Sequence, residues 1–68
     1  MRTAEALEKL ELDVPEIKTF LDDRKEVLHK TSKKDDVIGE IRGSLATLRR
    51  LGHVTDAGFR ALLTYYTL

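Results

Sequence analysis

The stretch that decides the fold is residues 35–68, DDVIGEIRGSLATLRRLGHVTDAGFRALLTYYTL. Apolar residues recur every three or four positions on both sides of a short break at residues 52–55, which is the spacing of one face of a helix. The stretch therefore predicts two helices, at about residues 36–51 and 56–67, that fold back on each other as a helical hairpin. Their apolar residues are Ile38, Ile41, Leu45 and Leu48 before the break, and Phe59, Leu62, Leu63 and Tyr66 after it.

The break carries residues suited to end one helix and begin the next. Gly52 follows Leu51 at the point where a helix commonly closes with a left-handed residue. Thr55 stands where its hydroxyl can accept a hydrogen bond from the first amides of the following helix. Val54 and Phe59 occupy the two positions of a hydrophobic staple around that cap. The break is therefore predicted to be a tight hinge.

The N-terminal half predicts two further helices, at about residues 3–11 and 14–30. Asp13 and Glu16 have the spacing of a capping box for the second of these helices, and Pro15 lies in its first turn, where no N–H is needed. The second helix has an apolar face for the core (Val14, Ile17, Phe20, Leu21, Val27, Leu28) and charged residues for solvent (Asp22, Asp23, Lys25, Glu26).

Together these signals predict one all-α domain over residues 1–68, a small bundle of three to four helices. A domain of 68 residues buries only about 60 % of the surface that its unfolded chain exposes, so its stability margin is small. The chain contains no cysteine, which excludes disulfides and cysteine-based zinc sites. Its stability must come from packing, within the chain or against a partner.

Charge and hydropathy limit the classes of partner. Lysine plus arginine and aspartate plus glutamate number 12 each, so the chain has no net field that attracts nucleic acid or an anionic membrane. No apolar run approaches the roughly 18 residues of a membrane-spanning helix, and no signal peptide is recognisable. We expect a soluble cytoplasmic protein without a membrane partner.

Two glycines interrupt the helical pattern of residues 36–51. Gly39 and Gly43 form, with Ala46, a stripe nearly opposite the apolar one. Each glycine inside a helix costs about 1 kcal/mol relative to alanine, which is large for a small domain. Close approach of a partner would account for that cost, so Gly39 and Gly43 are candidate partner-binding residues. The alternative is that they are tolerated surface glycines.

The last helix is apolar or small around more than half of its circumference. Beyond its core face it carries Ala57, Ala61, Tyr65 and Leu68. Either this helix is central and the first two helices cover that side, or these four residues bind another chain. We treat all four as candidate partner-binding residues, with Tyr65 as the anchor, because a tyrosine ring buries area while its hydroxyl stays hydrated.

A second hypothesis is nucleic-acid binding. The hinge has the length of the turn in a helix-turn-helix motif. Arg60 is, however, the only basic residue on the helix that would enter the groove, and Asp56 at its start would repel phosphate. The candidate nucleic-acid-binding residues are Arg42, Arg49, Arg50 and Arg60.

No residue pattern predicts catalysis. His29 and His53 do not have the spacing of metal ligands, and Ser32 and Ser44 have no base at a motif spacing. The sequence therefore predicts neither an enzyme nor a metal site, a cofactor or a small-molecule substrate.

One short pattern has a family resemblance. Gly52, Val54, Thr55 and Phe59 fit G-x-[IV]-T-x-x-x-F, which resembles the hinge of SHOCT domains, a family of short C-terminal helical hairpins. Gly58 stands where that family usually has glutamate. The resemblance implies association through a helical hairpin.

The leading hypothesis is a small protein-interaction or regulatory module that binds through helical surfaces, to a partner protein or as a homo-oligomer. The alternative is a small nucleic-acid-binding protein. The salt dependence of binding distinguishes the two hypotheses, because phosphate contacts weaken steeply as the salt concentration rises whereas apolar association persists.

Overall fold

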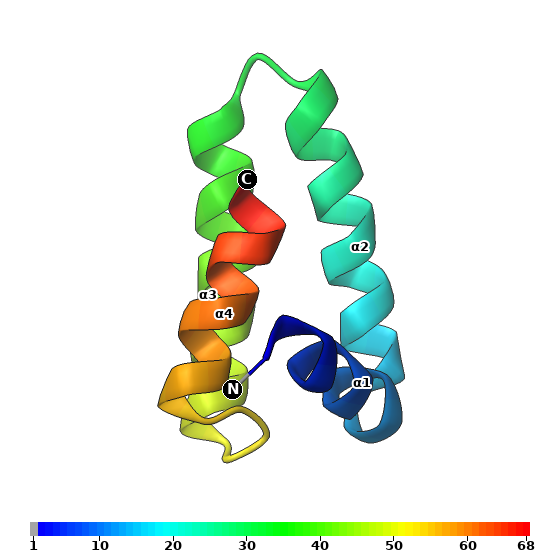
Figure 1. The fold of residues 1–68 in the computed structure, drawn as a ribbon. Helices are drawn as coiled ribbons and strands as arrows, with labels where there is room; N and C mark the ends of the chain where they lie inside the picture. Colours follow the sequence, from blue (N-terminus) through cyan, green and yellow to red (C-terminus); the bar gives the residue numbers. More distant parts are fainter. Residues whose placement is uncertain (1) are drawn as a thin grey trace.

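The computed structural model describes residues 2–68, and this part of the chain is an all-α bundle, as the sequence predicts. It measures 32 × 19 × 17 Å. Figure 1 shows α2 and α3 as two long antiparallel helices, with α1 and α4 in front of them. The helices are α1 (Thr3–Asp13), α2 (Pro15–Lys30), α3 (Lys34–Arg50) and α4 (Asp56–Thr67).

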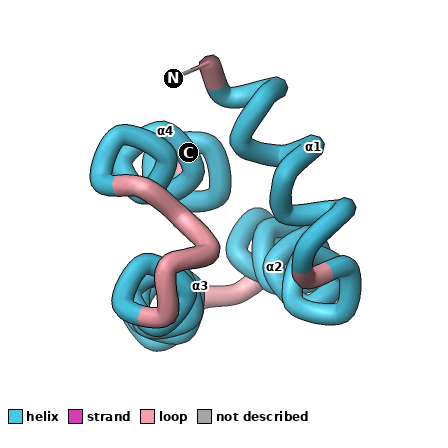
Figure 2. Tube along the Cα trace, turned by 90° about the horizontal axis from the view of Figure 1, so that it is seen from below, coloured by secondary structure: helices cyan, strands magenta, loops and turns pink. Residues whose placement is uncertain are grey.

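Seen along its long axis, the bundle has two layers (Figure 2). One layer is the hairpin of α2 and α3, and the other contains α4 and the short α1, which crosses the end of the bundle. α4 packs against all three other helices. Because α1 and α4 occupy the same side, no helix within residues 2–68 lies over the outer side of the α2–α3 hairpin.

The hinge between α3 and α4 has the predicted geometry. Gly52 has φ +88°, its N–H donates to the carbonyl of Arg49 at 3.1 Å, and the N–H of His53 donates to the carbonyl of Leu48 at 2.9 Å. These two bonds form a Schellman motif. Thr55 caps α4, because its Oγ1 accepts from the amide of Gly58 at 3.0 Å. The predicted helical hairpin is confirmed.

The predicted start of the second helix is wrong in detail. α1 continues to Asp13, so only Val14 separates it from α2, and the Asp13–Glu16 capping box does not form. The carbonyl of Val14 instead accepts from the amides of Ile17 and Lys18 at 3.1 and 3.0 Å. Pro15 is the first residue of α2, as predicted.

The third helix begins two residues before its predicted start at about residue 36. α3 begins at Lys34, so Asp35 lies in its first helical turn rather than before it. There its carboxylate still lies at the positive end of the helix dipole.

One core joins the four helices. Its fully buried large side chains come from every helix and are Leu10, Leu21, Ile41, Leu45, Leu48, Leu62 and Tyr66. Among the described residues, no helix is long and apolar enough to cross a membrane.

Candidate functional site

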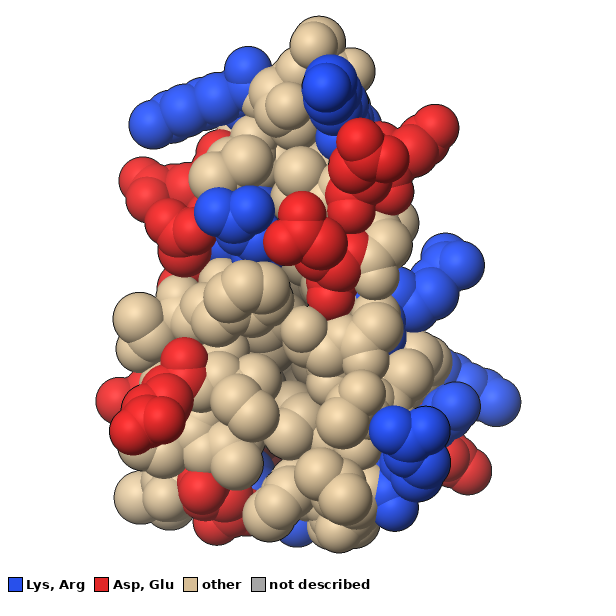
Figure 3. Space-filling model, turned by 180° about the vertical axis from the view of Figure 1, so that it is seen from behind, with Lys and Arg blue, Asp and Glu red and all other residues tan. Residues whose placement is uncertain are grey.

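A groove of about 300 Å³ lies between α2 and α3, on the outer side of their hairpin. Figure 3 shows this side as a largely uncharged area over the lower half of the two helices. The groove lies where the start of α2 meets the end of α3. Its lining residues are Glu16, Ile17 and Phe20 from α2, Ser44, Thr47 and Leu48 from α3, and Leu51, which directly follows α3.

Two large apolar side chains of the groove are exposed to solvent. Phe20 is 41 % exposed and Leu51 is 66 % exposed. Phe20 was expected in the core because it continues the apolar pattern of α2. It lies instead on the side of that pattern that faces away from α1 and α4. Neighbouring exposed apolar side chains around a groove are typical of an interaction surface.

The upper end of the apolar area is closed by a bridge of charges across the two helices. Nη2 of Arg24 lies 2.7 Å from Oδ2 of Asp23, and its Nη1 lies 3.6 Å from Oε2 of Glu40 on α3. The guanidinium of Arg24 also lies 5.7 Å from the centroid of the Phe20 ring. The bridge therefore separates the apolar groove from the polar end of the hairpin.

Below the Arg24 bridge, the two sides of the groove carry opposite charges. Figure 3 shows acidic atoms on the α2 side of the uncharged area and basic atoms gathered on the α3 side. Glu16 lines the groove on the α2 side, and Arg50 is exposed in the last turn of α3. Within residues 2–68, neither of these two side chains forms an ion pair.

The glycine stripe adjoins this groove. A Cβ added at Gly39 or Gly43 would have no neighbouring atom within 4 Å outside its own helix backbone, so no other part of the described chain approaches them. Gly43 lies one turn before Thr47, whose hydroxyl donates to the Gly43 carbonyl at 2.9 Å. Binding of a partner at Gly39 and Gly43 remains a prediction.

The predicted surface on α4 is partly covered. Ala57 and Leu68 are exposed, whereas Ala61 and Tyr65 are half-buried. The ammonium of Lys25 lies 4.3 Å from the centroid of the Tyr65 ring and donates to the Tyr65 carbonyl at 2.6 Å. The helix is thus central in the bundle, and a partner-binding role for its four residues remains a prediction.

Two of the four candidate arginines, Arg49 and Arg60, lie beside different groups of residues. Arg49 lies over the ring of Phe59, 4.3 Å from its centroid, and its Nε lies 3.9 Å from Oδ1 of Asp56. Arg60 lies on α4 beside a shallow depression that includes Thr3. Figure 1 shows α4 returning alongside α3, whereas the helices of a helix-turn-helix cross at about 90–120°. Nucleic-acid binding by Arg42, Arg49, Arg50 and Arg60 therefore remains a prediction without support from the hinge.

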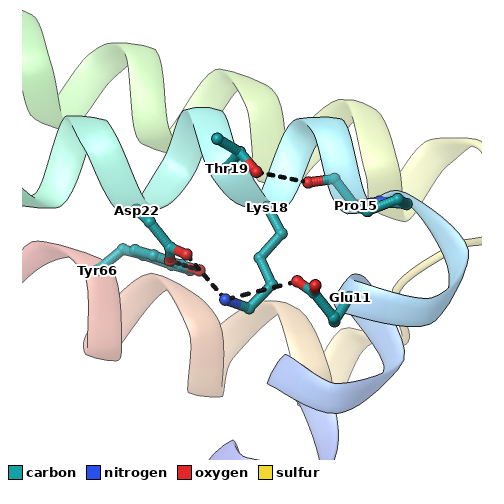
Figure 4. Close-up of polar contacts among 6 residues, drawn as sticks. All are labelled: Glu11, Pro15, Lys18, Thr19, Asp22 and Tyr66. Carbon is teal, nitrogen blue, oxygen red and sulfur yellow. Dashed lines mark hydrogen bonds and ion pairs between the residues drawn. The ribbon is translucent and has the colours of Figure 1, made fainter.

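A polar network joins α1, α2 and α4 on the other side of the bundle (Figure 4). Asp22 accepts from the hydroxyl of Tyr66 at 2.8 Å and from Nζ of Lys18 at 2.8 Å. Nζ of Lys18 also lies 3.8 Å from Oε2 of Glu11. Burial and the bond to Asp22 raise the pKa of Tyr66, and the bond to Asp22 raises the pKa of Lys18. These groups satisfy one another, which is the arrangement of a structural network.

Within residues 2–68, no three metal-ligating side chains lie together. Comparisons with protein-family models, with curated proteins and with solved structures find no match to this chain. The resemblance to SHOCT domains is therefore confined to the hinge pattern.

Proposed function

We propose that this protein is a small protein-interaction module, and that its α2–α3 groove binds a helix of a partner protein. The observation that carries the proposal is the pair of exposed side chains that line the groove, Phe20 on α2 and Leu51 directly after α3. Burying both would remove apolar surface from water, at roughly 25 cal/mol for each Å² buried.

The shape and composition of the groove favour a helix as the occupant. The groove runs between two antiparallel helices, so a third helix can pack along it. Gly43 and Ser44 present little side-chain bulk on α3, which allows a backbone to approach. A nucleic acid is a poorer occupant, because the lining is apolar and includes the carboxylate of Glu16.

Photo-crosslinking tests the proposal. A photoreactive residue is placed at Thr47 in the groove, or at Thr64 on α4 as the matched control, and the chain is irradiated in cells of its source. We expect a protein adduct at Thr47 that disappears when Phe20→Glu is introduced into the same chain. An adduct with nucleic acid, an adduct only at Thr64, or no adduct at Thr47 would overturn the proposal.

A further inference from the structure

We propose that the occupant of the α2–α3 groove is a second copy of this chain, related to the first by a two-fold axis parallel to the α2–α3 hairpin. This inference rests on the proposed function of the groove as a helix-binding surface. It specifies both the partner and its orientation. The result is an antiparallel arrangement of four helices, two from each copy.

The opposite charges on the two sides of the groove select this axis. Rotation about an axis parallel to the helices places α2 of each copy over α3 of the other, so the acidic side meets the basic side. Rotation about an axis across the helices places α2 over α2 and the acidic side over the acidic side. Like charges that face each other oppose association, so the first orientation is favoured.

The same rotation brings two unpaired side chains into register. α2 begins at the end of the hairpin where α3 finishes (Figure 1). Glu16 lines the groove together with Leu51, the neighbour of Arg50, so Glu16 and Arg50 lie at similar heights along the hairpin. The parallel axis preserves these heights and sets Glu16 of one copy against Arg50 of the other. Since neither has an ion-pair partner among residues 2–68, the pairing replaces no ion pair within that part of the chain.

Gly43, which precedes the groove residue Ser44, has a role in this arrangement. Phe20 and Ser44 line the same groove from opposite helices. The two-fold axis therefore directs Phe20 of each copy toward the segment around Gly43 and Ser44 of the other. The empty space around Gly43 leaves room for that ring and for close helix packing. The exposed phenylalanine and the costly glycine then have one common explanation.

Reciprocal charge exchange tests the inference. The association constant of the full chain is measured by sedimentation equilibrium at low salt. We expect a wild-type dimer, and about tenfold weaker association for Glu16→Arg or for Arg50→Glu, because each replaces two attractions in the dimer with two repulsions. An equimolar mixture of these two variants should regain wild-type association as a heterodimer, and so should the double variant Glu16→Arg/Arg50→Glu.

Matched controls carry the same charge changes on the exposed surface of α1. Glu8→Arg and Lys9→Glu should associate as wild type does, with circular dichroism verifying the fold of every variant. A wild-type chain that stays monomeric at millimolar concentration overturns the inference. If the photoreactive residue at Thr47 then forms an adduct with a different protein, the proposed function of the groove still stands. A wild-type dimer that the mixture fails to restore overturns the proposed orientation. If Tyr65→Glu abolishes the dimer and the Glu16 and Arg50 variants do not weaken it, the groove is not the dimer interface.

Discussion

The hydroxyl of Tyr66 donates a 2.8 Å hydrogen bond to Oδ1 of Asp22, 44 residues earlier in the chain. Tyr66 is a fully buried side chain near the end of α4, and Asp22 lies in the middle of α2. The bond therefore joins the last helix to the hairpin on the side that α4 covers. The opposite side, which contains the candidate groove, remains open.

Removal of this hydrogen bond should destabilise the bundle. We expect Tyr66→Phe to lower the free energy of unfolding by about 1 kcal/mol, because the ring still packs but the hydroxyl is lost. Tyr65→Phe is the matched control, since the Tyr65 hydroxyl makes no hydrogen bond within residues 2–68. Urea unfolding measures both variants. An equal loss in the two variants would refute the assigned role of Asp22.

Stability should fall at alkaline pH because of the same tyrosine. Its pKa is raised above the ordinary 10.0 by burial and by Asp22, so the folded chain holds this proton more tightly than the unfolded chain does. Its contribution is complete below about pH 10 and is lost as the pH rises above that value. Tyr66→Phe should therefore show a smaller decline than wild type in urea unfolding across this range. Tyr65→Phe should retain the wild-type decline, and a decline in Tyr66→Phe as steep as in wild type would contradict the prediction.

The glycines should respond to alanine in opposite directions. Gly52→Ala should cost about 1–2 kcal/mol, because φ of +88° is strained for a residue with a Cβ. Gly39→Ala should stabilise the monomer by up to about 1 kcal/mol, since the added methyl meets open space. Thermal unfolding at a concentration where the chain is monomeric compares the two. Destabilisation by Gly39→Ala would show that something packs there.

The two predicted helix caps should differ in their effect on stability. Thr55→Ala should cost about 1 kcal/mol, because the hydroxyl caps α4 through the amide of Gly58. Asp13→Ala should cost much less, since Asp13 lies inside α1 and caps no helix. Urea unfolding of both variants checks this difference. A large loss of stability for Asp13→Ala would indicate that the Asp13–Glu16 capping box does form.

The hinge was predictable because its signals are local. A left-handed glycine at Gly52 and a threonine cap at Thr55 depend only on residues within one turn of them. The start of α2 was not predictable in the same way. Asp13 is a residue type that favours a helix N-cap, yet the chain passes directly from α1 through Val14 into α2, so Asp13 ends α1 instead.

The groove was beyond prediction because it depends on which side of the hairpin the other helices cover. Periodicity shows that Phe20 belongs to the apolar face of α2. That face is wider than the part that the other helices bury, and the sequence does not show which of its edges stays exposed. The sequence indicates even less about the exposure of Leu51, since this residue lies at the helix end beside Gly52. The opposite charges of Glu16 and Arg50 gain meaning only when both are placed on one face.

A dilution series followed by ¹⁵N–¹H correlation spectra tests most directly that two copies of this protein associate through the α2–α3 face. Spectra of the wild-type chain are compared from millimolar to micromolar concentration. We expect the shifts that change to belong to residues 16–20 and 43–51, and we expect Phe20→Glu to abolish these changes. Changes confined to residues 57–68, or none at all, would contradict self-association through this face.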